Sequence, residues 1–366
     1  MKAALIGCGR IGFLLESDPL RYKPCTHWGG ARSAGIRINL ACDINPERLD
    51  AFSAAAGIPG ANCYDSHLEL LRKHSPEFVV IATWTPSHAP ICIDAVKNGA
   101  RVIVIEKPMA PDLASARKMI RLCEKHGVSL IVNHERRYDP RYRKVKKIID
   151  DGTIGEVRTV HASMLTGGYR GASDAAEGGG PLMHDGTHLV DMVRFLFGDI
   201  VRASGEFSRE GRSSGFEDRA VAWMKTESGA DVFLEAGGSR RYFVFELEIS
   251  GTLGKIVVGN GYEALFMRRK SRLYTGFHDL AEAAFPGYGK GNCFSELYRE
   301  AKKALSGRQK EISSSGADGY GAIEAIHAVY LSAHRNGAAV KLPVRPGDAD
   351  LGEIFGLTRS GAKKIL

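Results

Sequence analysis

The sequence predicts an α/β domain built on a parallel, doubly wound sheet, followed by an α+β domain with a large open antiparallel β-sheet. Three observations lead to this fold class. Short apolar runs alternate with helix-like stretches up to about residue 133, and a glycine-rich turn follows the first run directly. Beyond about residue 155, apolar and polar residues partly alternate between glycine-rich turns, as in strands with one covered face.

Each element of the first part has its own pattern. Buried strands are predicted from short, continuous runs rich in Val, Ile and Leu: Ala3–Ile6, Ile38–Ala41, Phe78–Ala82, Val102–Ile105 and Ser129–Val132. Helices are predicted between them at Pro46–Ala56, His67–His74, Ala89–Asn98 and Asp112–His126, with Asp112 as an N-cap and stops at Asn98-Gly99 and His126-Gly127. Repeated strand–helix–strand units predict a parallel sheet covered on both faces.

The first strand–helix turn has the sequence Gly7-Cys8-Gly9-Arg10-Ile11-Gly12. In such a turn the first glycine allows a tight reversal, the second lets the backbone approach a pyrophosphate, and the third lets helix and strand pack closely. Backbone N–H groups at the start of the helix, including those of Arg10 and Ile11, would bind the diphosphate. We therefore expect a Rossmann fold that binds a dinucleotide.

The second strand leads to Asp43, which we expect to accept hydrogen bonds from the adenosine ribose hydroxyls, with Ile44 beside it. No arginine follows in Ile44-Asn45 to bind a 2′-phosphate, so NAD is expected rather than NADP. Asp43 lies 31 residues past Gly12, where about 20 is usual. An insertion is therefore expected at Ser17–Gly30, which either folds over the cofactor or forms a surface loop.

The later part of the chain is predicted to mix strands with helices. The strands are Glu156–Met164, Arg219–Lys225, Asp231–Ala236, Phe243–Ser250 and Lys255–Gly259; the helices are Thr187–Phe197, Phe294–Ser306 and Ala317–Asn336; and Gly205–Phe216 is expected to be a long loop. We divide the chain into an NAD-binding domain at 1–133, a substrate-binding and oligomerisation domain at 134–343, and a C-terminal arm at 344–366.

Composition excludes several classes of protein. Hydrophobic residues make up 44% and charged residues 25%, as in ordinary globular proteins. No apolar run approaches the roughly 18 residues that span a bilayer, so no membrane association is expected. Seven cysteines without a C-x-x-C pair indicate reduced thiols in a cytoplasm.

The formal net charge of +8 is partly concentrated between residues 136 and 147. We interpret this basic run as a solvated helix face; the alternative is a positive rim that attracts a phosphorylated or carboxylated substrate. Because no nucleic-acid-reading module accompanies the run, no nucleic-acid partner is expected.

Further motifs follow in order: Thr83-Trp84-Thr85-Pro86-Ser87-His88, then Glu106-Lys107-Pro108, then Arg136-Arg137-Tyr138-Asp139-Pro140. Together with the glycine-rich turn, they resemble the Gfo/Idh/MocA oxidoreductase family, named for glucose–fructose oxidoreductase and inositol dehydrogenase. The resemblance extends to about Pro343. It implies that Thr83, Thr85, Pro86 and His88 lie against the nicotinamide half of the cofactor and Glu106 near its ribose. It also implies that Lys107 reaches the substrate hydroxyl that loses hydride, before a proline that is often cis.

A second polar cluster includes His184, Asp185 and His188. Relatives commonly place an aspartate four residues before the histidine, and here His184 holds that position, one residue before Asp185. Either the helix starts irregularly at Gly186, or His184 has taken over the polar role of the aspartate. His188 is the expected general base, because a near-neutral imidazole suits proton removal from an alcohol. By the same resemblance Arg136 contacts substrate, and Tyr169 lies in the loop that covers the pocket.

His184 and His188 also have a spacing that can chelate zinc on one helix face. The glutamate of H-E-x-x-H is replaced by Asp185, Gly186 weakens the helix, and no third ligand is evident. No metal is therefore expected.

The resulting hypothesis is reversible, NAD-dependent oxidation of a secondary hydroxyl of a sugar, polyol or nucleotide-linked sugar, with or without a phosphate group. We expect a homodimer or homotetramer formed through the C-terminal sheet. Two alternatives stay open: an NAD-using glycoside hydrolase of the same family, and an NAD-binding regulator without catalysis.

Overall fold

The computed structural model describes residues 1–167, 179–209, 215–309, 311–345 and 347–356. The chain forms two compact units, each described by itself below. The first contains Met1–Asp139 and Lys290–Tyr320, and the second contains residues 140–289 with the described residues from 321 onward. Residues 290–320 thus join the N-terminal unit, although they are distant from it in the sequence.

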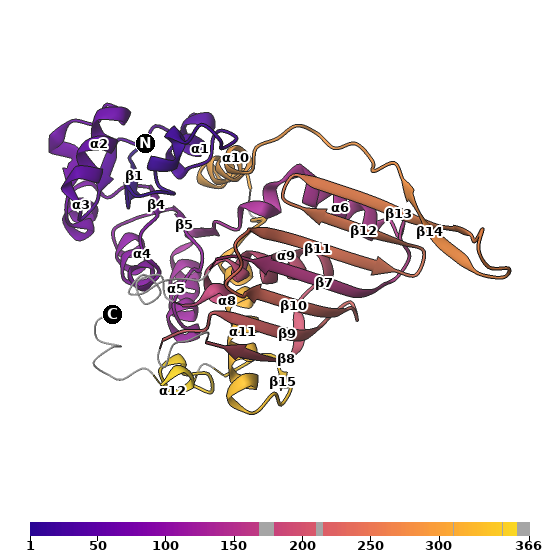
Figure 1. Ribbon diagram of the computed structural model, residues 1–366. Coiled ribbons are helices and arrows are strands. Elements are labelled where there is room, and N and C mark those ends of the chain that lie inside the picture. The colour runs from indigo at the N-terminus through magenta and orange to yellow at the C-terminus, as the bar shows by residue number, and fades with distance from the viewer. Residues whose placement is uncertain (168–178, 210–214, 310, 346, 357–366) are drawn as a thin grey trace. The chain divides into compact units, whose positions relative to one another are not determined.

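The first unit is built on a six-stranded sheet in which every pairing is parallel, in the order β3-β2-β1-β4-β5-β6. Its strands are β1 Ala3–Ile6, β2 Leu40–Cys42, β3 Cys63–Tyr64, β4 Phe78–Ile81, β5 Val102–Ile105 and β6 Ser129–Val132. The helices are α1 His27–Ser33, α2 Pro46–Ala56, α3 His67–His74, α4 His88–Lys97, α5 Leu113–His126 and α10 Cys293–Leu305 (Figure 1). This strand order is that of a doubly wound dinucleotide-binding domain, so the predicted fold class is confirmed.

Local sequence explains the helix ends. The Asp112 side chain accepts a hydrogen bond from the Ser115 amide, and Gly127 ends α5 in the left-handed region at φ 66°. Asn45 caps α2 in the same way, directly before Pro46 at the first helical position. Such caps satisfy backbone groups that a helix leaves unpaired, as the sequence pattern predicted.

The expected insertion, Ser17–Gly30, is partly exposed and partly buried in the first unit, so it is not simply a surface loop. Leu20 and Tyr22 are exposed, whereas Thr26 and His27 are buried at the start of α1. The glycine-rich turn therefore leads not into a long helix but into a helical turn and the 3₁₀-helix Leu14–Ser17. Helix α1 follows only after this insertion.

The second unit is built on a nine-stranded sheet in the order β14-β13-β12-β11-β7-β10-β9-β8-β15. Its strands are β7 Val157–Leu165, β8 Ile200–Ser208, β9 Arg219–Thr226, β10 Asp231–Gly237, β11 Val244–Gly251, β12 Gly254–Gly259, β13 Tyr262–Lys270, β14 His278–Ala283 and β15 Val340–Lys341. Its helices are α6 Pro140–Asp150, α8 Pro181–His184, α9 Gly186–Phe197 and α12 Leu351–Phe355, while α11 Gly316–His334 has residues in both units.

One face of this sheet is covered, as predicted, and Figure 1 shows α8 and α9 against it. Along β9, Ala220, Ala222 and Met224 are buried while the residues between them are partly exposed. The sheet is mixed rather than purely antiparallel, because β7 and β10 pair in parallel. The expected loop Gly205–Phe216 was placed too early, since residues 205–208 continue β8 in pairing with β9.

The C-terminal residues 347–356 pack onto the second unit. Phe355 is buried, and its ring centroid lies 4.8 Å from that of Phe207 and 4.9 Å from that of Tyr330. Tertiary aromatic packing therefore orders α12, which has no long apolar pattern of its own.

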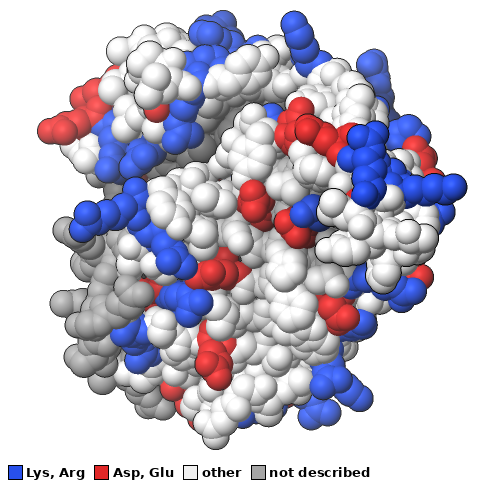
Figure 2. Space-filling view, turned by 45° about the vertical axis from the view of Figure 1, so that its right-hand side comes forward, with Lys and Arg blue, Asp and Glu red and all other residues white. Residues whose placement is uncertain are grey.

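Part of the basic run lies on an exposed helix face, as predicted, whereas Arg137 is buried before the helix begins. On α6, Lys146 pairs with Asp150 and Lys147 with Asp151 one turn later, and Arg141 pairs with Glu263. On the face displayed in Figure 2, basic and acidic side chains are interspersed rather than gathered by sign. Among the described residues, no helix has the length and apolar character needed to cross a bilayer.

Candidate active site

The glycine-rich turn follows β1, and its three glycines have different surroundings. Gly7 has φ +97°, and a Cβ atom there would lie 2.5 Å from the Ala82 carbonyl oxygen. A Cβ atom at Gly12 would collide with the Gly7 carbonyl oxygen. At Gly9, outside its chain neighbours, the nearest described atom would be Nη1 of Arg48 at 3.8 Å. Gly7 and Gly12 therefore serve the turn itself, and Gly9 leaves the space that a pyrophosphate needs.

Asp43 lies directly after β2 and is 8% exposed. Its Oδ2 accepts a hydrogen bond from the Cys8 amide at 2.7 Å, and its Oδ1 accepts one from the Asn45 amide at 2.8 Å. Each carboxylate oxygen can accept a further hydrogen bond, so the residue fits the expected contact with ribose hydroxyls. Ile44 beside it is 87% exposed, an apolar surface that an adenosine can cover.

Two residues near this turn were missed by sequence reasoning. Arg48 brings a guanidinium to Gly9 from the first turn of α2, beyond the Ile44-Asn45 pair from which the preference for NAD was predicted. The Cys8 thiol is fully buried, and burial followed by the charge of Asp43 raises its pKa.

The turn after β4 carries His88, which is fully buried. Its Nε2 lies 2.9 Å from the Thr83 carbonyl oxygen and its Nδ1 lies 3.0 Å from the Pro108 carbonyl oxygen. Burial lowers the pKa of His88, while the hydrogen bonds to the two carbonyl oxygens act in the opposite direction. His88 thus connects the Thr83–His88 turn to the segment after β5, while Thr85 is also buried.

The segment after β5 begins with Glu106, which is 6% exposed, and continues with the partly exposed Lys107. The Lys107–Pro108 peptide bond is cis. The Lys107 amide donates to Oε2 of Glu106 at 3.2 Å. Lys107 therefore stands at the carboxyl end of a central parallel strand, where ligands bind in such sheets.

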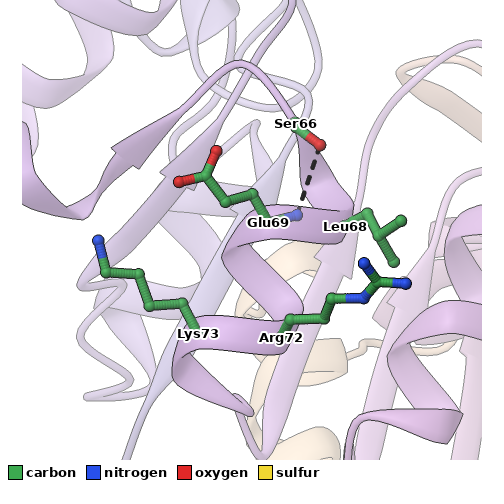
Figure 3. Close-up of a pocket in the computed structure, with 5 residues that line it drawn as sticks. All are labelled: Ser66, Leu68, Glu69, Arg72 and Lys73. Carbon is green, nitrogen blue, oxygen red and sulfur yellow. Dashed lines mark hydrogen bonds between the residues drawn. The ribbon is translucent and has the colours of Figure 1, made fainter.

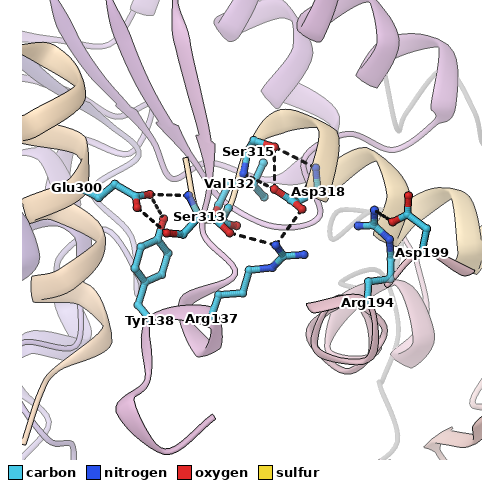
Figure 4. Close-up of polar contacts among 10 residues, drawn as sticks. Val132, Arg137, Tyr138, Arg194, Asp199, Glu300, Ser313, Ser315 and Asp318 are labelled. Atoms are coloured by element: carbon cyan, nitrogen blue, oxygen red, sulfur yellow. Dashed lines mark hydrogen bonds and ion pairs between the residues drawn. The ribbon is translucent and has the colours of Figure 1, made fainter. Parts of the chain in front are cut away.

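In the segment after β6, Arg137 and Tyr138 make buried structural contacts, whereas Arg136 does not share their burial. Nη1 of Arg137 contacts Oδ1 of Asp318 at 2.8 Å and the Ser313 carbonyl oxygen at 3.0 Å, and Tyr138 donates to Glu300 at 2.6 Å (Figure 4). Both residues are buried and bind the 313–318 segment and α10 of the same unit. Arg136, directly before Arg137 in the chain, is partly exposed.

In the second unit, the predicted histidine cluster lies at a break between two helices. Helix α8 ends at His184, and α9 begins at Gly186, so Asp185 stands between them. Nδ1 of His184 and Oδ1 of Asp185 are 3.0 Å apart. The helix start is therefore irregular, as one of the two sequence alternatives proposed. His184, Asp185 and His188 are each partly exposed among buried neighbours such as Met183 and Leu189.

A buried carboxylate supports this break, and nothing in the sequence pointed to it. Glu217 is 1% exposed, and its Oε1 accepts hydrogen bonds from the Leu182 amide at 2.9 Å and from the Tyr330 hydroxyl at 2.8 Å. Burial raises the pKa of Glu217 to about 7. Its partners lie 35 and 113 positions away in the sequence, beyond the range of any local pattern.

Two further observations complete the account of the predicted residues. Tyr169 lies outside the residues that the structure describes. A shallow depression on α3, lined by Ser66, Leu68, Glu69, Arg72 and Lys73 (Figure 3), contains none of the predicted site residues.

Comparison with known proteins agrees with this geometry. Residues 1–134 match the GFO/IDH/MocA oxidoreductase family, NAD-binding Rossmann fold, and residues 142–257 match the GFO/IDH/MocA C-terminal domain. A D-apiose dehydrogenase of Paraburkholderia graminis is 30% identical over 356 residues, covering 93% of this chain and 89% of that protein. An inositol 2-dehydrogenase of Mycolicibacterium smegmatis is 30% identical over 210 residues, covering 56% of this chain and 59% of that protein.

Solved structures share the fold. The WlbA dehydrogenase from Bordetella pertussis, solved with NADH and UDP-GlcNAcA, superposes with a TM-score of 0.74 at 24% identity, covering 94% of this chain and 99% of that one. An oxidoreductase from Agrobacterium radiobacter, solved with NAD+, L-tartaric acid and magnesium, gives a TM-score of 0.70 at 23% identity, covering 93% and 98%. With both of its domains matched and a curated relative similar over nearly its whole length, the chain belongs to the GFO/IDH/MocA family and is an oxidoreductase with an NAD-binding Rossmann domain.

Proposed function

We propose that the protein is a dehydrogenase that oxidises or reduces a secondary hydroxyl or ketone of a sugar, polyol or nucleotide-linked sugar with NAD. The observation that carries this proposal is the partial exposure of Lys107 and His188, each set among buried neighbours at the end of a structural element. Polar side chains in such positions are available to a ligand while their backbone is held firmly. The relatives named above act on small polyhydroxylated substrates according to their names, which supports the substrate class.

The residues of the first unit bind the cofactor in this proposal. The Gly7–Gly12 turn, with the amides of Arg10 and Ile11, receives the diphosphate, and Asp43 and Ile44 receive the adenosine. Thr83, Thr85, Pro86, His88 and Glu106 form or support the nicotinamide end. Bound NAD supplies the hydride acceptor. The open space at Gly9 and the remaining acceptor capacity of Asp43 are the features that fit this group.

His188 is assigned as the general base that takes the hydroxyl proton, because an imidazole titrates near neutral pH. Lys107 orients the reacting oxygen and stabilises its developing negative charge. Asp185, held 3.0 Å from His184, is assigned to a neighbouring substrate hydroxyl, and Arg136 to the same substrate. Whether His184 or Asp185 serves in place of the family aspartate is decided by replacing each with alanine and comparing KM.

The domain roles follow from these assignments. We propose NAD binding for 1–133, substrate binding and oligomerisation for 134–343, and a C-terminal arm at 344–366. Within the middle range, residues 134–139 and 290–320 pack in the first unit and would support the NAD-binding domain. The uncovered face of the large sheet supports assembly as a homodimer or homotetramer, because Phe233 is 46% exposed there and stacks on His161. All seven cysteines are free, which supports a reducing, cytoplasmic location.

The test is a screen of sugars, polyols and nucleotide sugars, following NADH absorbance with NAD and NADP in parallel. NAD-dependent turnover on at least one of them is the expected result. Release of a free sugar without accumulation of NADH would instead identify an NAD-using glycoside hydrolase. NAD binding without turnover on any compound would identify a regulator. This alternative stays open because His184 stands where relatives commonly have an aspartate.

A further inference from the structure

A buried row of polar side chains lies behind Lys107 in the first unit. It runs from the Tyr298 hydroxyl to Nδ1 of His27 at 2.7 Å, and from Nε2 of His27 to Oε1 of Glu106 at 2.8 Å. The Asn133 amide also donates to Oε1 of Glu106, at 2.5 Å. Exposure is 1% at His27, 6% at Glu106 and 2% at Asn133, so water does not screen these contacts.

The direction of each hydrogen bond is set by chemistry. An ionised carboxylate can only accept, so Nε2 of His27 is the donor to Glu106. The Tyr298 hydroxyl can serve Nδ1 as donor or acceptor, and it fixes the orientation of the ring in either case. Burial alone would raise the pKa of Glu106, but the hydrogen bond and charge of His27, the charge of Lys107 and the Asn133 amide lower it to about 2. Glu106 is thus a buried anion near neutral pH.

The second oxygen of Glu106 is directed at the reactive segment. Oε2 accepts the backbone amide of Lys107 at 3.2 Å, while Oε1 is occupied by His27 and Asn133. Rotation of the carboxylate would break all three contacts together. His27, together with Asn133, therefore sets the orientation of the carboxylate that accepts the Lys107 amide.

We propose that His27 is a positioning residue, which holds Glu106 so that Glu106 fixes the backbone of Lys107 for reaction; this inference rests on the function proposed above. It gives the Ser17–Gly30 insertion a role, because that segment delivers His27 to the carboxyl end of β5 from a helix that starts at position 27. The insertion acts through Lys107 and needs no contact of its own with a ligand.

Two substitutions at His27 separate its two hydrogen bonds. The amide nitrogen of a glutamine reaches the position of Nε2, so His27→Gln keeps the donor to Glu106. An asparagine reaches only the position of Nδ1. His27→Asn therefore keeps a hydrogen-bond partner for the Tyr298 hydroxyl and loses the hydrogen bond to Glu106. His67→Asn is the matched control, because His67 also pairs with a carboxylate, Asp94, at 3.1 Å, but in a partly exposed position on α3.

The experiment has one readout that needs no turnover. Hydrogen–deuterium exchange of the Ile105–Met109 peptide follows the Lys107 amide, and kcat and NADH affinity are measured on the same preparations. We expect His27→Asn to speed exchange and lower kcat by about tenfold or more, the factor carried by a hydrogen bond to a charged group. Its NADH affinity should change by less than about threefold, and His27→Gln and His67→Asn should match the wild type.

Equal exchange in His27→Asn and His27→Gln would overturn the inference, as would a wild-type kcat in His27→Asn. A wild-type protein that turns over no compound would defeat the proposed function, and the exchange measurement would then decide alone whether His27 positions Lys107.

Discussion

The amide of Cys8 in the glycine-rich turn donates a hydrogen bond to Oδ2 of Asp43, 35 residues later, at 2.7 Å. The two strands that meet at this edge of the sheet, β1 and β2, are thereby joined at the point where the adenosine half of NAD is expected. Asp43 has two tasks as a result. It shapes the turn, and it offers its remaining acceptor capacity to ribose hydroxyls.

Replacing Asp43 with asparagine should weaken NAD binding about tenfold or more, because one carboxylate oxygen becomes an N–H donor that faces other donors. NADP should lose less affinity than NAD, since the substitution also removes a negative charge. Fluorescence titration with NADH and NADPH measures both effects. Asp50→Asn, in an exposed position of α2, is the control. Unchanged NADH affinity in Asp43→Asn would remove Asp43 from the site.

Gly7→Ala and Gly9→Ala should fail in different ways. At Gly7, with φ +97° and a carbonyl oxygen 2.5 Å from the new Cβ atom, alanine should lower the free energy of unfolding by about 2 kcal/mol or more. At Gly9 there is room for a methyl group, so stability should stay near that of the wild type while NADH affinity falls about tenfold. Thermal unfolding and NADH titration distinguish the two. Normal NADH binding by Gly9→Ala would contradict the pyrophosphate assignment.

Lys107→Met should lower kcat by about a hundredfold or more and leave NADH affinity near normal, because it removes the cation that stabilises charge on the reacting oxygen. Steady-state kinetics on a substrate found in the screen gives kcat, and titration gives affinity. Lys97→Met, on the exposed side of α4, controls for loss of a lysine from the same unit. If Lys107→Met retained wild-type kcat, the role given to Lys107 would be wrong.

Glu217 should make stability depend on pH between about 4.5 and 7. Its pKa is raised to about 7 in the folded protein, so the folded state holds a proton that the unfolded state has lost. Stability therefore falls as pH rises through this window, by roughly 3 kcal/mol when the shift is converted. Glu217→Gln should remove this pH dependence of stability, because glutamine does not titrate. Its amide oxygen can still accept the hydrogen bonds from the Leu182 amide and the Tyr330 hydroxyl. Urea unfolding at pH 5 and pH 8 gives the free energy of unfolding of both proteins. If it changed with pH by the same amount in the wild type and in Glu217→Gln, the role given to Glu217 would be wrong.

The sequence predicted those parts of the fold that depend on local patterns. The runs that form β1, β4, β5 and β6 are short, apolar and bounded by turns, and the Asn45-Pro46 pair marks the start of α2. Strands β13 and β14 were missed because many of their residues are exposed and carry weak apolar alternation. Position in the sheet, rather than local preference, makes them strands.

For the site, short motifs located the backbone turns but not the side chains that hold them. The resemblance pointed to Glu106 and Lys107 but not to the residues behind them. His27 lies 79 positions before Glu106, and Tyr298 lies 271 positions after His27. No periodicity links residues at such separations. The same holds for Glu217, whose role depends on the fold bringing Leu182 and Tyr330 to one carboxylate.

The burial of Cys8 has a practical consequence for the chemistry of the protein. A cysteine beside a phosphate-binding turn would ordinarily be exposed to alkylating reagents and peroxide, and its thiolate is the form that reacts. Here the carboxylate of Asp43 and the surrounding core keep the thiol protonated and covered. Maleimide dyes should therefore react with the partly exposed thiols of Cys63 and Cys293 before they reach Cys8.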